Sequence, residues 1–160
     1  MQIIGHRGAR REAPENTLGG FTYLRSLDIH RVELDLHLTR DNQLVVIHDY
    51  TTQRTTGKTA SVSQSSSSEL AQHNAAAQFK NWHQSEPIAT LQQVLSAWPT
   101  LQSIQLEVKT ADVHKIPAIA DRLAFIIHEF QLGTKATVTS HDVRVLAQMH
   151  ERYPHIRRGY

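Results

Sequence analysis

The sequence has 160 residues, the usual length of one domain with a single sizeable core. Its 17 Lys and Arg residues exceed its 15 Asp and Glu residues by two, so no basic excess points to nucleic acid or an anionic membrane. The absence of cysteine excludes disulfides, thiolate metal sites and cysteine nucleophiles. The sequence also lacks a signal-peptide pattern and any apolar run near the ~20 residues that span a bilayer. It therefore predicts a soluble, cytoplasmic domain with no nucleic-acid partner and no stable membrane association.

Short β-rich runs alternate with helical patterns, which is typical of an α/β fold with parallel strands. Thr17 is the expected N-cap of the first helix, and Pro117 lies at an early position of a later one. The predicted strands are residues 3–5, 32–38, 44–47, 103–109 and 136–139, with a further strand beginning at Ile156. The first predicted helix carries Leu18, Phe21, Leu24 and Leu27 on a common face. The later predicted helices are residues 91–98, 117–130 and 142–153.

The segment from Thr51 to Ser68 is dominated by hydroxyl side chains, with 11 Ser or Thr among its 18 residues. Such a segment offers few apolar side chains for a core, so we expect a mobile surface excursion. Within a single domain that spans residues 1–160, residues 51–85 are therefore predicted to form a flexible insertion.

The spacing between two neighbouring strands predicts a β-hairpin. Only eight residues separate Asp35 from Leu44, whereas a parallel crossover needs about a dozen or more. With Asp41 and Asn42 as the two turn residues, Asp35 is expected directly opposite His48 on the same face of the hairpin.

Polar side chains gather where the predicted strands end. Because the carboxyl ends of parallel strands meet at the mouth of an α/β sheet, we expect these side chains to form one site. The four clusters are His6-Arg7, Glu33 with Asp35, His48-Asp49, and Glu107 with Lys109.

The carboxylates of this expected site favour a metal ion. Glu33 and Asp35 are two residues apart in a strand, so both side chains project from the same face. Carboxylates so close repel unless a cation lies between them, and Glu107 supplies a third oxygen donor from a later strand. Three carboxylates suit Mg²⁺ or Ca²⁺, with positions left for water and a substrate oxygen. The alternative is an exposed acidic strand face with Lys109 as a surface partner.

The histidines and cations around the carboxylates favour phosphate chemistry. His6 and His48 titrate near neutral pH and suit a base and an acid, while His37 shares the strand face at the edge of the site. Arg7 and Lys109 add positive charge beside the expected metal, as an anionic substrate requires. Each residue also has a simpler interpretation, because a lone histidine at a strand end is often structural and each cation can pair with a neighbouring glutamate.

The order and spacing of these motifs resemble the glycerophosphodiester phosphodiesterases, which are PI-PLC-like barrels, from residue 3 to about residue 158. Each motif alone is weak evidence, but their combination is highly specific. The matching segments are His6-Arg7-Gly8, Pro14-Glu15-Asn16-Thr17, Glu33-Leu34-Asp35, Thr39-Arg40-Asp41, Val46-Ile47-His48-Asp49, Arg54-Thr55-Thr56, Thr90-Leu91-Gln92-Gln93-Val94-Leu95, Leu106-Glu107-Val108-Lys109 and Thr139-Ser140.

The resemblance implies a TIM-type (β/α) barrel that hydrolyses glycerophosphodiesters, its small-molecule substrates, to glycerol 3-phosphate and an alcohol. It also implies a divalent metal, Mg²⁺ or Ca²⁺. By position, the family's site residues are the acid/base pair His6 and His48, the metal ligands Glu33, Asp35 and Glu107, the phosphate-binding Arg7 and Lys109, and the supporting residues Glu15 and Asn16. For Glu15 the resemblance leaves two positions open, one near the metal and one paired with Arg7.

The chain departs from this family most clearly in length, since a TIM barrel usually takes about 250 residues. About five of eight strands are predicted, with the β-hairpin as an excursion after the second. The sequence therefore indicates an incomplete barrel, a fragment of a longer enzyme. Its open strand edge favours pairing between copies of the chain. A smaller departure is His141, where the family usually has phenylalanine.

Two other functions fit parts of the same pattern. The first is a phospholipase D-like phosphodiesterase that acts on lysolipids, which ranks lower because the segment from Thr51 to Ser68 is polar and supplies no apolar rim. The second is a non-catalytic remnant that binds a metal or a partner, an interpretation that the short chain favours and the intact set of ligands opposes.

Overall fold

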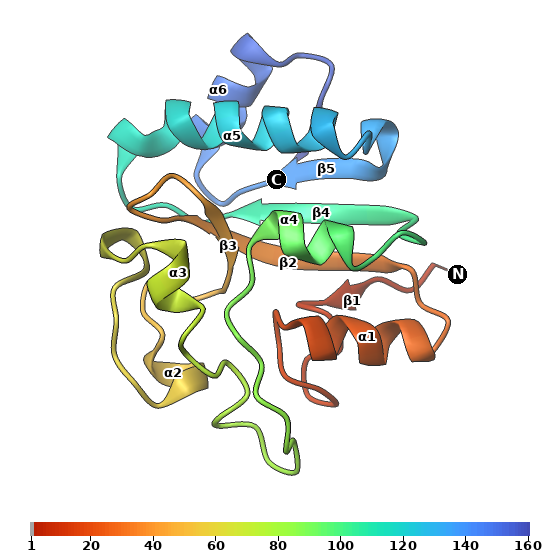
Figure 1. Ribbon diagram of the computed structural model, residues 1–160. Coiled ribbons are helices and arrows are strands. Elements are labelled where there is room, and N and C mark those ends of the chain that lie inside the picture. Colours follow the sequence, from red (N-terminus) through yellow and green to blue (C-terminus); the bar gives the residue numbers. More distant parts are fainter. Residues whose placement is uncertain (1) are drawn as a thin grey trace.

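The computed structural model describes residues 2–160, in which five parallel strands form one sheet in the order β1-β2-β4-β5-β6 (Figure 1). A short antiparallel strand, β3, pairs with the C-terminal part of β2. The strands are β1 (Gly5–His6), β2 (Arg31–Leu38), β3 (Leu44–Val46), β4 (Ser103–Val108), β5 (Ala136–Thr139) and β6 (Arg157–Gly159). The α-helices are α1 (Leu18–Ser26), α2 (Gln53–Thr56), α3 (Ser67–Leu70), α4 (Leu91–Ser96), α5 (Ile116–Glu129) and α6 (Val143–Arg152).

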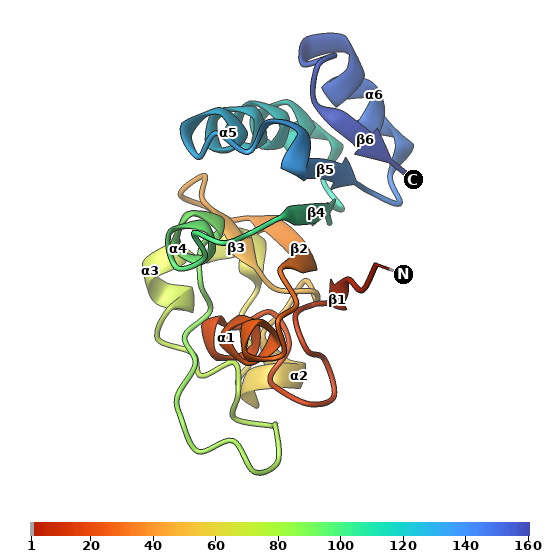
Figure 2. The same ribbon diagram turned by 90° about the vertical axis from the view of Figure 1, so that its right-hand side faces the viewer.

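The parallel strands form an arc, and helices α1, α4, α5 and α6 lie on its outer side (Figure 2). Alternate residues of β2, among them Val32, Leu34 and Leu36, are fully buried in the core that these helices share with the sheet. Because successive side chains of a strand point to opposite faces, the polar residues between them project to the inner side of the arc. One strand therefore builds the core with one face and the site with the other.

Local sequence signals explain where the helices begin. The Thr17 side chain caps α1 by accepting a hydrogen bond from the Gly20 amide at 3.0 Å, as predicted. Thr90 caps α4 in a reciprocal capping box with Gln93. Asp142 caps α6 by accepting a hydrogen bond from the Arg144 amide. These caps satisfy amide groups that the first turn of a helix leaves without partners.

The first strand is shorter than predicted. Ile3 and Ile4 lie outside any strand, with 54% and 40% of their surfaces exposed. Strand β1 consists of Gly5 and His6 alone, because only these two residues pair with β2. The strand therefore begins two residues later than the apolar pattern indicates and ends one residue later, at His6.

The β2–β3 hairpin forms as predicted, but the predicted register is wrong by one residue. Leu36 pairs with Val46, so Asp35 does not lie opposite His48. The cause is the turn, in which Asn42 takes a left-handed conformation with φ +56°. The Thr39 amide donates to the main-chain oxygen of Gln43 at 2.9 Å, so the turn that this bond encloses has three residues, 40–42, rather than two, a common alternative in hairpins. His48 lies in the loop after β3 instead of within the strand pair.

The hydroxyl-rich segment contributes more core than predicted. Val62 within the segment and Leu70, two residues beyond its end, are fully buried and pack with Val45 and Ile88 in a second, smaller core beside β3. The segment contains α2, α3 and a single 3₁₀ turn, so its few apolar residues are spaced to face inward together. Its flexibility stays a prediction.

Candidate active site

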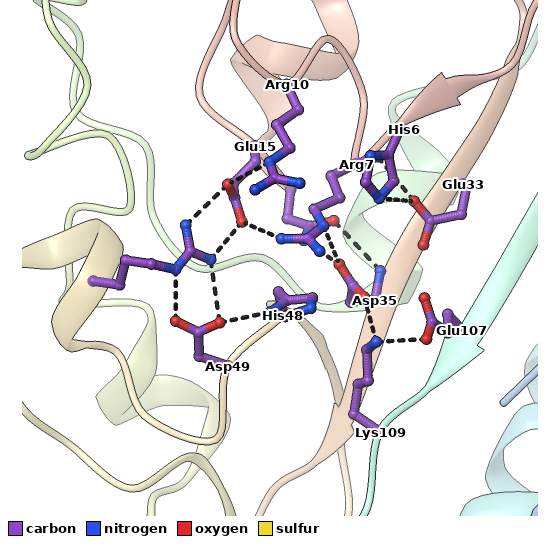
Figure 3. A network of polar contacts seen from close by, with 12 residues as sticks. His6, Arg7, Arg10, Glu15, Glu33, Asp35, His48, Asp49, Glu107 and Lys109 are labelled. Carbon is purple, nitrogen blue, oxygen red and sulfur yellow. Dashed lines mark hydrogen bonds and ion pairs between the residues drawn. The ribbon is translucent and has the colours of Figure 1, made fainter. Parts of the chain in front are cut away.

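The strand register brings the predicted polar clusters together at the C-terminal ends of the strands (Figure 3). His6 is the register partner of Glu33 across β1 and β2, and Asp35 is that of Glu107 across β2 and β4. Residues in register on parallel strands project to the same face. The structure thus places one histidine and three carboxylates on the inner side of the arc, whereas their chemical roles stay predictions.

The three carboxylates form a group that fits a divalent cation. One oxygen of each of Glu33, Asp35 and Glu107 lies within 4.8 Å of the other two. Asp35 is fully buried, and its Oδ1 has no hydrogen-bond partner among the described residues, which is also true of the buried Oε1 of Glu33. Buried carboxylate oxygens without partners are costly unless a cation binds them. These are the hard oxygen donors that Mg²⁺ and Ca²⁺ prefer.

Burial and the charge of Asp35 raise the pKa of Glu33 to about 7. Desolvation disfavours the charged form of a carboxyl group, and a second carboxylate nearby acts in the same direction. Near neutral pH and without a cation, Glu33 is therefore partly protonated. A bound divalent ion would displace this proton, which makes ion binding dependent on pH.

Glu33→Gln is expected to stabilise the metal-free protein above neutral pH. Folded Glu33 keeps its proton up to about pH 7, whereas an ordinary glutamate loses it near 4.5, so the free energy of unfolding falls as the pH rises between these values. Glutamine has no charge to bury, so its advantage should be absent near pH 4 and reach up to a few kcal/mol near pH 8, at about 1.4 kcal/mol per pKa unit. Denaturant unfolding of both proteins in EDTA measures this. A difference that stays constant with pH would contradict it.

The loop after β1 holds Asp35 in place through two residues in left-handed conformations, Arg7 with φ +53° and Asn16 with φ +56°. Asn16 Nδ2 donates to Asp35 Oδ2 at 2.9 Å, and Arg7 Nε lies 3.2 Å from the same oxygen. The Arg7 amide donates to Glu33 Oε2 at 2.9 Å. Such backbone strain at non-glycine residues often accompanies functional sites. Here it directs one main-chain and two side-chain groups at the carboxylates.

Lys109 supplies positive charge on the opposite side of the carboxylates. Its Nζ donates to Glu107 Oε1 and lies 3.4 Å from Asp35 Oδ1. Burial disfavours the charged amine, but the two carboxylates outweigh this and raise the pKa of Lys109 above its ordinary value. The ammonium group therefore stays charged and neutralises part of the cluster in the absence of a metal.

The two predicted catalytic histidines lie on different sides of the carboxylates (Figure 3). His6 Nε2 lies 3.8 Å from Glu33 Oε2, and more than half of the His6 side chain is exposed. Burial of the remaining part, together with the charges of Arg7 and Arg10, lowers the pKa of His6 below 6.5. The imidazole of His6 is therefore mostly neutral near pH 7.

His48 is oriented by two neighbours, Asp49 and His37. Its Nδ1 lies 2.6 Å from Asp49 Oδ1, and since a carboxylate only accepts, Nδ1 is the protonated nitrogen. Burial opposes ionisation of Asp49, but hydrogen bonds from Arg54 and His48 outweigh it and lower its pKa to about 2. His37 Nε2 donates to the main-chain oxygen of His48 at 3.0 Å, and its ring packs edge-on against Tyr50.

Glu15 pairs with arginines, which is one of the two positions left open above. Its carboxylate accepts from Arg7 Nη1 at 3.1 Å and from Arg54 Nη1 and Nη2 at 3.0 and 2.6 Å, and Arg10 Nε lies at 3.5 Å. Arg54 in turn donates to Asp49 at 2.7 Å. A continuous chain of ion pairs thus links the loop that carries Arg7 to the loop that carries His48.

The sequence pattern predicts Asp49 in the site beside His48, but it assigns no role there to Arg54 or His141, which the structure also places in the site. Arg54 comes from the hydroxyl-rich segment that was expected to be mobile. The sequence contains one clue to the role of Arg54, which is the only charged residue in the run from Thr51 to Thr56. His141 Nε2 lies 3.2 Å from Glu107 Oε1.

The chain is similar in sequence to proteins of one known family. A sequence model of the glycerophosphoryl diester phosphodiesterase family matches residues 6–159. YhdW of Bacillus subtilis is 32% identical over 156 residues, which cover 98% of this chain and 63% of the relative. A glycerophosphodiester phosphodiesterase of Caldanaerobacter subterraneus is 30% identical over 158 residues, which cover 98% of this chain and 65% of the relative.

Solved structures show the same fold. A phosphodiesterase from Oleispira antarctica, in complex with the product sn-glycerol-3-phosphate, superimposes with a TM-score of 0.88 at 26% identity over 100% of this chain and 65% of that one. The predicted α/β fold, a TIM barrel present here in part, is confirmed. The chain spans 63–65% of the length of the curated relatives named above. Within residues 2–160, no helix combines the length and apolar character that a membrane span requires.

Proposed function

Because the chain belongs to the glycerophosphoryl diester phosphodiesterase family, we propose that it hydrolyses glycerophosphodiesters to glycerol 3-phosphate and an alcohol with the help of a divalent metal ion. One observation carries this proposal. Two buried carboxylate oxygens without hydrogen-bond partners lie beside two cationic side chains and between two histidines. Relatives named as glycerophosphodiester phosphodiesterases and a related structure with bound glycerol 3-phosphate support the choice of substrate.

Glu33, Asp35 and Glu107 would hold the metal ion, which Mg²⁺ or Ca²⁺ fits by its preference for oxygen donors. When bound, such an ion neutralises the charge of a phosphate oxygen and so favours attack on phosphorus. Arg7 and Lys109 already contact these carboxylates, and in our proposal they also bind the phosphate group of the substrate. Arginine and lysine differ in this role, because the planar guanidinium donates two parallel hydrogen bonds and the ammonium acts as a point charge.

The two histidines would transfer the protons. The neutral ring of His6 suits a general base that accepts the proton of the attacking hydroxyl, either a water or the 2-hydroxyl of the substrate's own glycerol. His48 would then donate a proton from Nε2 to the oxygen of the departing alcohol, since its Nδ1 is engaged by Asp49. Asp49 orients this ring as the buried aspartate of a hydrolase triad orients its histidine. With water as the nucleophile, the two rings recover their starting states by exchanging protons with solvent. With the 2-hydroxyl as the nucleophile, the first step forms a cyclic phosphate, which water would then open to glycerol 3-phosphate, with His48 accepting the proton of the water and His6 returning its proton to the glycerol oxygen.

The direct test measures release of glycerol 3-phosphate from glycerophosphocholine by the purified chain. We expect release with Mg²⁺ or Ca²⁺ and loss of release on addition of EDTA, with recovery when the ion is restored in excess. Ion binding by the same preparation is measured by calorimetry as a control for folding. Release that persists in EDTA would contradict the metal requirement, and no release from a folded, ion-binding chain would contradict the proposed activity of this chain.

A further inference from the structure

His141 lies just beyond the end of β5, next to the face of the sheet that carries the carboxylates. Thr139 of β5 is the register partner of Glu107 of β4. His141 follows Thr139 by two residues, as Lys109 follows Glu107, and lies in the bend directly after the end of β5. His141 thus stands beside Lys109 at the open end of the sheet, one step beyond the carboxylates.

The contact between His141 and the carboxylates is direct. His141 Nε2 lies 3.2 Å from Glu107 Oε1, the oxygen that Lys109 also contacts. Two neighbouring ligands of one divalent ion, each bound at about 2.0–2.2 Å, lie about 3 Å apart. Nε2 and Oε1 therefore have a separation that two ligands of one ion can adopt, while His141 lies just outside the group of carboxylate oxygens that are all within 4.8 Å of one another and would turn toward them to bind the same ion. The histidine side chain is 81% exposed, so its ring is accessible to an ion that enters from solvent.

The buried oxygens point to a ligand independently of this contact. Asp35 Oδ1 and Glu33 Oε1 have no hydrogen-bond partner among the described residues, and the Asp35 side chain is fully buried. A simple ion pair between His141 and Glu107 explains one contact at the rim of the site. It does not account for the two deeper oxygens that lack hydrogen-bond partners, of which Asp35 Oδ1 has the ammonium of Lys109 at 3.4 Å.

We propose that His141 is a nitrogen ligand to the metal ion of the three carboxylates, and that it shifts the preference of this site toward transition-metal ions such as Zn²⁺. Carboxylates alone suit Mg²⁺ and Ca²⁺, whereas imidazole favours Zn²⁺ and its neighbours in the first transition row. The inference rests on the proposed function in one respect, the presence of an ion at the carboxylates. Hydrolysis is not needed to test it.

The test compares ion binding by the wild-type chain, His141→Phe and His155→Phe. His155 is an exposed histidine just before β6, at the end of the parallel strands opposite the site, so its variant controls for general loss of a surface histidine. Calorimetry measures the Kd of Zn²⁺ and of Ca²⁺ for each protein. We expect His141→Phe to weaken Zn²⁺ binding about tenfold or more and Ca²⁺ binding less than about twofold, with no change in His155→Phe.

Nitrogen-15 NMR of the histidine rings gives a second readout. Zn²⁺ should shift one ring nitrogen of the wild-type chain, and this signal should be missing from His141→Phe. Equal Zn²⁺ affinity in the wild type and His141→Phe overturns the proposal, as does an equal loss for Zn²⁺ and Ca²⁺, which would mean that His141 only positions Glu107. Absence of Zn²⁺ binding or of the ring shift also overturns it. Failure of the proposed function appears separately, as lack of glycerol 3-phosphate release by a chain that binds ions normally.

Discussion

Asp35→Asn is expected to lower the hydrolysis of glycerophosphocholine about 10³-fold or more and to weaken Mg²⁺ or Ca²⁺ binding severely. Asp35 is the only fully buried residue of the three carboxylates, and it contacts Arg7, Asn16 and Lys109 at once. Asparagine keeps the shape but removes the charge that attracts the ion, and its amide group is a donor that faces cations. A loss of 10³-fold corresponds to about 4 kcal/mol of transition-state stabilisation, a reasonable share for a metal ligand.

Steady-state kinetics and calorimetric ion binding test this expectation, with Asp28→Asn as the matched control. The Asp28 side chain is 99% exposed and contacts only the ring of His30, so the same change of charge there should leave both measurements unchanged. Circular dichroism of Asp35→Asn establishes that the chain folds. Retention of more than a tenth of the activity, or of unaltered ion affinity, would show that Asp35 is a structural ion-pair partner of Arg7 and not a ligand.

His48→Ala and His6→Ala should each lower kcat about 10²–10⁴-fold, the usual contribution of a general acid or base. Because the two histidines serve one reaction, the double variant should lose little more than either single one. The pH profile separates their roles. Since the pKa of His6 lies below 6.5, the rate of the wild-type chain should fall on the acid side of that value, where His6 becomes protonated. This acid limb should be absent in His6→Ala.

His155→Ala serves as the control for these variants, since this exposed residue lies at the end of the strands away from the site. Ion affinity should be close to normal in both single variants, because neither ring is a proposed ligand. A loss of less than fivefold in either variant would be incompatible with a proton-transfer role. If the acid limb of the pH profile survives unchanged in His6→Ala, it belongs to another titrating group. Glu33, which lies beside His6 and has a pKa of about 7, is the first such group to test.

The inner face of β2 was predictable because it depends on a local rule. Apolar and polar residues alternate from Val32 to Leu38, and a period of two puts Glu33 and Asp35 on one side whatever packs against the strand. The same holds for Glu107 in β4, whose buried residues also alternate. The residue types at these ends of the strands therefore predict which side chains make up the site, although they do not predict the contacts between them.

The position of His48 was not predictable in the same way, because it depends on the conformation of a single turn residue. The hairpin turns over three residues with Asn42 in a left-handed conformation, and asparagine adopts both right- and left-handed conformations readily. The change of one residue moves His48 out of the strand pair. Its orientation then comes from Asp49 and from His37, which belongs to the neighbouring strand.

The ion pairs around Glu15 were unpredictable for a different reason. They join three segments that are distant in the sequence, and nothing in a hydroxyl-rich run indicates which of its residues will reach back to the loop after β1. The composition of this run indicated that it would contribute few side chains to a core. The structure shows that Val62 and Leu70 anchor it, which brings Arg54 to Glu15.

The shortness of β1 has a consequence for how the protein responds to warming. This strand is attached to the sheet through two residues, whereas β2 pairs with β4 over six. Segments with few interactions open locally at lower free energy than the rest of a fold. Hydrogen exchange should therefore be faster at Gly5 and His6 than at Asp35. On heating, the strand end that carries His6 would detach while the carboxylates remain assembled, so turnover would decline at temperatures where the chain still retains its ion.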